Sequence, residues 1–414
     1  MQWPQWKDRI GRVIGRRTNP CTGVSQQKAA EELPLRAELL NVDQLERHAQ
    51  AIAGAHRLAT GHADDKLLPR LAENERVLVD TYDLIAAAAA RNRRIAPAAE
   101  WLLDNFYLIE EQIRSTRRLL PRSYSGELPR LATGGGADYP RVYSIALELI
   151  AHTDGRMDAV SLTGFLTAYQ SVVPLKLGEL WALPLMLRLA LIENLRRVAV
   201  RIAQGRCDRD QASQWAEKMI RTVEQKPTDL VLVLADMARE NPPLSGAFLA
   251  ELTRHLQGQH PSFSFASSWL EQRLADQGQT TEHLILAEGQ IQAADQVSVG
   301  NSITSLRFLA VNDWRQFVAD QSLVEQTLSR DPAGVYSSMD FATRDRYRHA
   351  VEAIARRSPC TEYDVAMRAV QLAQAEVSVQ SSQRTTHVGY FLVDHGLHTL
   401  ESMLHIQLTF VVLI

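Results

Sequence analysis

The chain has 414 residues, of which 45% are hydrophobic and 22% charged, and its formal net charge is -3. This balance is ordinary for a globular protein, and the slight negative charge argues against a nucleic-acid-binding protein, which would be strongly basic. A chain of this length predicts two or three domains.

Residues 1–34 are basic and then rich in Pro, Gly and Thr. We expect them to form a mobile basic leader, since chain ends order only where they dock. Apolar residues recur there at helical spacing, so a short helix lying on a surface or a partner is the alternative.

Residues 35–204 predict an N-terminal helical domain. Asn41 is a good cap for a helix that begins at Val42. Helices are also expected over about 64–93 and over 98–120, where Glu110 and Arg114 have the i, i+4 spacing of an ion pair. The Gly-rich loop 121–140 matches neither the P-loop nor the dinucleotide fingerprint.

The stretch Pro174–Val200 organises this first domain. Between Leu180 and Ile192 nearly every residue is apolar, and Arg188 is the only charge. A helix that is apolar almost all round is buried on most sides. We therefore predict a central helix at residues 179–199 and place residues 180–192 among the most buried of the chain.

Arg188 needs a partner if this helix is buried, because an unpaired charge inside a protein is very costly. Its neighbours at i-4 and i+4 are Pro184 and Ile192, so the partner must come from another helix. We expect an ion pair with one acid of two neighbouring helices: Asp104, Glu110, Glu111 or Glu148.

Residues 205–400 predict a second helical domain. Gly205-Arg206-Cys207 is expected to end the helical block that holds the central helix, and Asp208-Arg209-Asp210 to cap a new helix over 211–223. Asp313 and Asp340 have the character of later helix caps, and Leu230–Leu234 could form either a strand or a helix. The predicted fold class is all-α, a multi-helix bundle or an irregular helical array.

Residues 401–414 end in the almost wholly apolar run MLHIQLTFVVLI. An exposed apolar tail is a liability in a soluble protein. We interpret it as the start of a truncated membrane segment, which implies contact with a membrane at the C-terminus, or as the product of a frameshift.

Carboxylates on helices that are expected to pack together give the candidate binding site. Glycoside chemistry needs two carboxyl groups across a cleft that is lined for sugar. The candidate substrate-binding residues are Glu110, Glu111, Glu148, Glu179, Arg188, Glu193 and Trp181. The alternative is that the acids pair with arginines and the aromatic rings fill the core. No catalytic residue is assigned.

Two groups of histidines are suggestive, His152 with Asp154 and His387 with Asp394 and His395. Neither has helical metal-binding spacing of the HExxH kind, so we expect no metal site.

Several long blocks make the chain similar to a known family. They include AEWLLDNFYLIEEQIRSTRRLLPRSYSGELPRL, GELWALPLMLRLALIENLRR, NSITSLRFLAVNDWRQFV and DPAGVYSSMDFATRDRYRHAVE. In order, from about residue 98 to 396, these resemble the N-terminal region of cyclic β-1,2-glucan synthases, which are large bacterial inner-membrane glycosyltransferases. The resemblance implies that the full-length enzyme builds cyclic β-1,2-glucan from UDP-glucose with Mg²⁺.

The chain departs from that family because it lacks Gln-x-x-Arg-Trp and a strand-borne Asp-x-Asp. We therefore expect a fragment truncated before the catalytic domains, with no cofactor and no transferase activity of its own. The first functional hypothesis is a non-catalytic scaffold or regulatory domain at the cytoplasmic face of the bacterial inner membrane, with the remaining synthase domains as partners. The second is a helical glucan-processing enzyme, and the third is a carbohydrate- or partner-binding groove.

Overall fold

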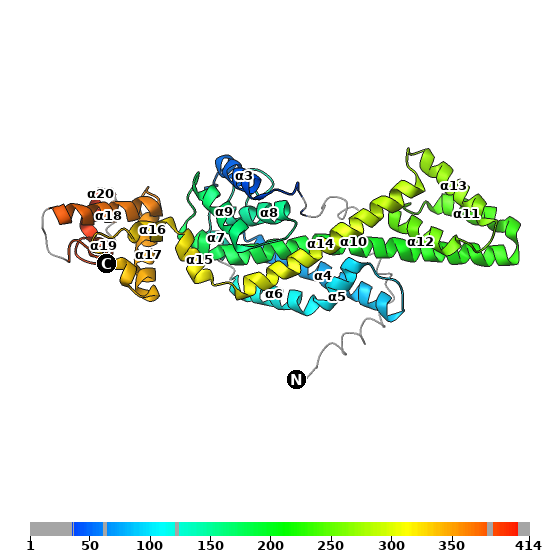
Figure 1. Cartoon of the computed structure of the whole chain (residues 1–414), viewed down its shortest axis with the longest axis horizontal. Helices are drawn as coiled ribbons and strands as arrows, with labels where there is room; N and C mark the ends of the chain where they lie inside the picture. Colours follow the sequence, from blue (N-terminus) through cyan, green and yellow to red (C-terminus); the bar gives the residue numbers. More distant parts are fainter. Residues whose placement is uncertain (1–34, 36, 61–63, 121–123, 379–383, 405–414) are drawn as a thin grey trace, which may run out of the picture.

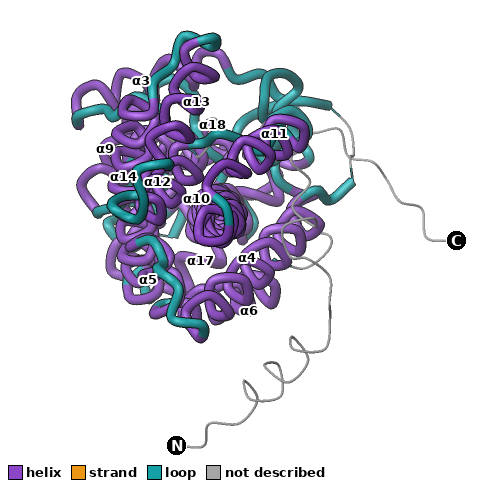
Figure 2. Tube along the Cα trace, turned by 90° about the vertical axis from the view of Figure 1, so that its right-hand side faces the viewer, coloured by secondary structure: helices purple, strands orange, loops and turns teal. Residues whose placement is uncertain are grey.

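The computed structural model describes residues 35, 37–60, 64–120, 124–378 and 384–404. Within these ranges the regular elements are helices, and the extended pairings are isolated bridges such as Leu58 with Leu131 (Figure 2). The predicted all-α fold is therefore confirmed. The leader at 1–34 and residues 405–414 of the apolar tail lie outside the described residues.

The first helices surround one end of a long axis. They are α3 (Val42–Ala55), α4 (Leu67–Ala90), α5 (Pro97–Asp104), α6 (Phe106–Leu119), α7 (Tyr124–Glu127), α8 (Arg141–Thr153) and α9 (Ala159–Gln170). Asn41 caps α3 as predicted, and its side chain and that of Gln44 form a reciprocal capping box. The helix expected over 98–120 is divided at Asn105, whose side chain folds back onto the carbonyl of Trp101.

The axis is α10 (Leu177–Gln225), which has 49 residues and is about 74 Å long at 1.5 Å per residue (Figure 1). The sequence-based end at Gly205–Cys207 is wrong, because α10 continues through it. Asp208 is not a cap, since its carboxylate accepts hydrogen bonds from the side chains of Gln204 and Ser245. A single glycine inside a helix lowers the stability by only about 1 kcal/mol relative to alanine, and the packing of α10 before and after Gly205 offsets this loss.

The remaining helices are α11 (Leu230–Glu240), α12 (Gly246–Leu256), α13 (Phe263–Ala275), α14 (Thr281–Val311), α15 (Trp314–Gln321), α16 (Leu323–Leu328), α17 (Phe341–Arg356), α18 (Glu362–Ser378), α19 (Val388–Val393) and α20 (Leu397–Met403), with 3₁₀ turns at Pro227–Asp229 and Tyr336–Ser338. Of these helices, α12 and α14 pack along α10, and the others lie toward the two ends of the molecule (Figure 1). The side chains of Asp313 and Asp340 cap α15 and α17 as predicted. The ambiguous segment 230–234 is helical.

In the part of the chain that the structure describes, buried hydrophobic side chains form three cores. The largest surrounds the first half of α10 and includes Val299–Val318 from α14 and α15. The second joins the end of α10 to α11–α13, and the third joins α16–α20. Figure 1 shows the second and third cores at opposite ends of the molecule.

Residues 180–192 are buried except for Trp181 and Arg188, which are partly buried, as the sequence predicts. No helix among the described residues has both the length and the apolar character that a membrane crossing requires.

Candidate functional site

Glu193 is the most heavily paired of the predicted site residues. It is 1% exposed and accepts hydrogen bonds from Arg70 of α4 at 2.7 and 2.9 Å. Arg196 and Arg197, one turn along α10, donate to the same carboxylate at 2.9 and 2.7 Å. Burial alone would raise the pKa of Glu193, but the bond from Arg70 and the surrounding positive charges lower it to about 2. Glu193 is thus held ionised inside the core.

Glu179 forms a second buried pair, at the beginning of α10. Its carboxylate is fully buried and receives Arg141 of α8 in a two-point contact, with N–O distances of 2.9 and 2.5 Å. The backbone N–H of Lys176 donates to it at 3.0 Å and completes the capping arrangement. This glutamate therefore starts a helix and joins it to α8.

Arg188 has a different partner from the one predicted from the sequence. Its guanidinium donates to the backbone carbonyl of Leu309 at 3.4 Å, and the described residues include no ion pair to Asp104, Glu110, Glu111 or Glu148. Burial lowers the pKa of Arg188. Leu309 is near the end of α14, where carbonyls lack helical partners and the helix dipole favours a cation. A sequence pattern does not show which helix end will face a side chain.

The other predicted residues do not join these two pairs. Glu110 forms the expected i, i+4 pair with Arg114 at 3.3 Å, and Glu111 is exposed. Trp181 packs edge-on against Phe341, with ring centroids 6.3 Å apart.

Glu148 on α8 lies beside two histidines, which the sequence analysis did not bring together. His48 Nε2 on α3 is 2.9 Å from Glu148 Oε2, and His152 Nε2 is 3.6 Å from the same oxygen. The sequence pattern predicts a group of His152 with Asp154, but Asp154 ends α8 in the left-handed conformation. His48 was missed because it is 100 residues from Glu148 in the chain. The i, i+4 spacing of Glu148 and His152 was the available signal.

The histidine group at the other end of the chain is also divided. His387 contacts Asp331 at 2.8 Å, whereas Asp394 pairs with Arg384 at 2.7 Å and lies 3.7 Å from His395.

A cavity of about 680 Å³ lies beside the middle of α10. Its lining is mixed, with six polar or charged and four apolar residues: Val200, Arg201, Gln204, Asp208, Asn241, Pro242, Pro243, Leu244, Arg273 and Gln277. Burial raises the pKa of Asp208, although Ser245 and Gln204 donate hydrogen bonds to it. This cavity offers hydrogen-bonding groups to a polar ligand.

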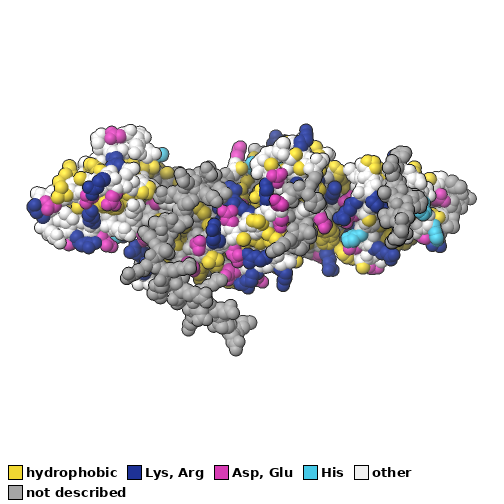
Figure 3. All heavy atoms as spheres, turned by 180° about the vertical axis from the view of Figure 1, so that it is seen from behind, with side chains coloured by type: hydrophobic (Ala, Val, Ile, Leu, Met, Phe, Trp, Pro, Cys, Tyr) yellow, Lys and Arg dark blue, Asp and Glu magenta, His cyan; other side chains and the backbone are white. Residues whose placement is uncertain are grey.

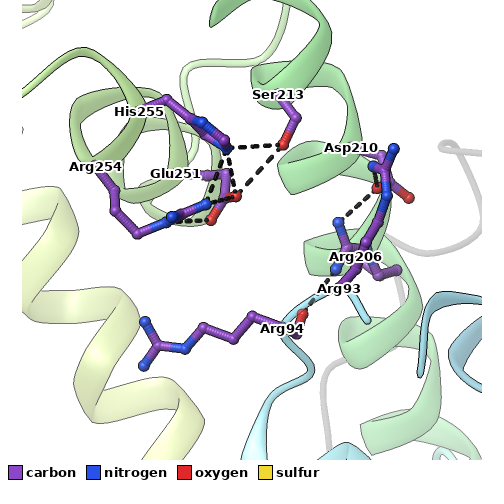
Figure 4. Close-up of polar contacts among 8 residues, drawn as sticks. All are labelled: Arg93, Arg94, Arg206, Asp210, Ser213, Glu251, Arg254 and His255. Carbon is purple, nitrogen blue, oxygen red and sulfur yellow. Dashed lines mark hydrogen bonds and ion pairs between the residues drawn. The ribbon is translucent and has the colours of Figure 1, made fainter. Parts of the chain in front are cut away.

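Two polar networks hold the neighbouring helices to α10 near this region (Figure 4). In one, Arg206 donates to Asp210 at 2.5 Å and to the carbonyl of Arg94 at 2.8 Å, and Arg93 also pairs with Asp210. The segment between α4 and α5 is thereby joined to the middle of α10.

In the other network, Glu251 of α12 accepts from Ser213 of α10 at 3.4 Å and pairs with Arg254 at 2.5 Å and His255 at 3.1 Å.

On the face shown in Figure 3, acidic and basic side chains alternate with apolar ones without a large patch of one sign.

Comparison with known proteins confirms the resemblance. Over 325 residues, or 78% of the chain, the sequence is 34% identical to the cyclic β-(1,2)-glucan synthase NdvB of Rhizobium meliloti (strain 1021). The chain matches only 11% of the length of that relative. No family model matches the chain. The described part of this chain is thus an all-α region that is similar to a small part of a cyclic β-(1,2)-glucan synthase.

Proposed function

We propose that the chain is a non-catalytic helical scaffold or regulatory region of a cyclic β-1,2-glucan synthase, acting at the cytoplasmic face of the bacterial inner membrane. The whole synthase would polymerise glucose from UDP-glucose with Mg²⁺, and its remaining domains would be the partners of this region. The observation that carries the proposal is the similarity to such a synthase over 78% of this chain. A structural role fits α10, a single 49-residue helix that joins two hydrophobic cores.

The state of the two buried glutamates supports a structural role. A glycosidase needs one carboxyl group that can give up a proton near neutral pH and a second carboxylate across a sugar-binding cleft. Glu179 and Glu193 are instead buried against arginines, and the pKa of Glu193 is held at about 2. These acids fix the positions of α4 and α8 on α10.

The test uses membranes from cells that express a cyclic β-1,2-glucan synthase with or without the region homologous to this chain. We expect membranes lacking the region to make less β-1,2-glucan from UDP-glucose and Mg²⁺, and the purified 414-residue chain alone to make none. Glucan formation by the chain alone would contradict the proposal, as would unchanged synthesis by membranes that lack the region.

The cavity beside α10, with its mixed polar and apolar lining, favours a second candidate function, carbohydrate binding. Gln204 and Asn241 line it, and amide side chains can donate to and accept from sugar hydroxyls. Calorimetric titration with linear β-1,2-glucan would show saturable binding that Gln204→Ala, inside α10, weakens and Asn312→Ala, beyond the end of α14, leaves unchanged. Absence of binding would remove this candidate.

A further inference from the structure

We propose that His48, Glu148 and His152 form a binding site for a divalent first-row transition metal, with Zn²⁺ as the best-fitting ion. Two helices supply the ligands: α3 carries His48, and α8 carries Glu148 and His152 one turn apart. Two imidazoles and one carboxylate are a ligand set that zinc uses with water in the fourth position. The proposal is independent of the proposed scaffold function.

The distances suit such an ion. One ligand atom from each of the three side chains lies within 4.8 Å of the others. Zinc bonds nitrogen and oxygen at about 2.0–2.2 Å, so tetrahedral ligand atoms are about 3.3 Å apart. The observed separations from Glu148 Oε2, 2.9 Å to His48 and 3.6 Å to His152, lie on either side of that value. Small side-chain movements would therefore admit the ion.

The orientation of His152 adds an independent observation. Its Nδ1 is 2.7 Å from the backbone carbonyl of Glu38. A carbonyl only accepts, so Nδ1 of the neutral ring carries the proton and Nε2 presents its lone pair to Glu148 and His48. A hydrogen bond from the second ring nitrogen to a carbonyl is the usual support of a metal-binding histidine.

The backbone around the site is also fixed. The N–H groups of Ala37 and Leu40 donate to the carbonyls of Ala151 and His152, both at 3.1 Å. These bonds tie the segment before α3 to the end of α8, and the Asn41 capping box then starts α3 in a direction that brings His48 to Glu148. The three ligands are thus carried by two helices whose relative position is set by hydrogen bonds.

The site is open enough for an ion and its water to enter. The side chains of His48, Glu148 and His152 are 25%, 42% and 13% exposed. A bound ion would join α3 to α8 and stabilise the folded chain, because it would bind only the folded arrangement.

The test titrates the purified full chain, without an affinity tag and freed of metal by chelation, with Zn²⁺ and with Co²⁺. We expect one saturable equivalent by calorimetry, a visible Co²⁺ absorption typical of four-coordination, and a Zn²⁺-dependent rise in Tm. His48→Gln and Glu148→Gln should each weaken binding at least about ten-fold, since loss of even an outer-shell partner costs that much.

Matched controls are His283→Gln and Glu111→Gln, two exposed residues away from the cluster. They should bind Zn²⁺ like the unaltered chain. Circular dichroism establishes that each variant is folded before titration. No saturable binding to the unaltered chain, or equal binding and equal Tm shifts in folded His48→Gln, would overturn the site.

Discussion

The two halves of α10 differ in how much of the helix surface is covered by other helices. The first half, from Leu177 to Ala203, is enclosed by helices of the largest core, and even Glu179 and Glu193 lie inside. The second half buries the hydrogen-bonded charges of Arg206 and Asp208 near its beginning, and beyond them one apolar stripe: Ala212, Trp215, Ala216, Met219 and Val223. On its other face, Glu217 and Arg221 are 59% and 71% exposed.

Charged side chains on this one helix are therefore found in two environments, buried and solvent-exposed. An enclosed charge must be met by a partner, whereas an exposed charge is solvated and its pairing contributes little.

The largest effect is expected for Glu193→Gln. The substitution leaves Arg70, Arg196 and Arg197 without their shared carboxylate, and breaking a buried pair costs about 3–5 kcal/mol. Glu217→Gln is the matched control, because Glu217 also pairs with an arginine four residues later on α10, but in solvent. It should change the free energy of unfolding little. Chemical denaturation measures both, and equal effects would remove the distinction between the two halves.

Lowering the pH should reduce the difference in the free energy of unfolding between the unaltered chain and Glu193→Gln. The pKa of Glu193 is about 2 in the folded chain against an ordinary value of 4.5, so its charge stabilises the folded state fully above pH 4.5. That contribution, roughly 3 kcal/mol from the pKa difference, is lost as the pH falls from 4.5 through 2. Denaturation curves of both proteins from pH 7 to 2 test this. A difference in the free energy of unfolding that stays constant from pH 7 to 2 would show that the substitution does not act through the charge of Glu193.

Arg188→Met is expected to change stability by no more than about 1 kcal/mol, in contrast to the 3–5 kcal/mol loss that an ion pair would imply. The side chain donates a long 3.4 Å bond to Leu309, and its Nε has no partner among the described residues. Methionine would fill the same apolar surroundings without a charge to desolvate. A melting temperature lowered as much as in Glu193→Gln would show that Arg188 has a stronger partner.

The smallest expected effect is an increase in the stability of the folded chain. Gly205→Ala should stabilise the chain by about 0.5–1 kcal/mol, because alanine is the better residue inside a helix. A Cβ there would lie 3.5 Å from the Arg209 side chain and 3.9 Å from Ala247, which are ordinary contacts. The control Gly258→Ala should destabilise, since Gly258 has φ of +77°. A loss of stability in Gly205→Ala would indicate that the helix is interrupted there.

The sequence predicted features that depend on local pattern. The caps at Asn41, Asp313 and Asp340, the Glu110–Arg114 pair and the burial of residues 180–192 all follow from residue type and helical spacing. They are decided within one or two turns of helix, where a single chain carries enough information.

The features that were missed depend on contacts between distant segments. Gly205 and Asp208 have the local character of a helix boundary, but α12 covers this stretch and Ser245 satisfies the carboxylate. The partner of Arg188 is a carbonyl 121 residues away, and His48 reaches Glu148 across 100 residues. Residue types alone do not reveal such neighbours.

The account depends most on the continuity of α10 between its two halves. Amide hydrogen exchange at residues 204–210 tests this directly, because helical amides are protected and those of an interrupted segment are not. We predict protection comparable to that of Trp215–Met219 and far above that of the turn at 257–259. Exchange at 204–210 as fast as in that turn would show that two separate helices meet there, and would contradict the account.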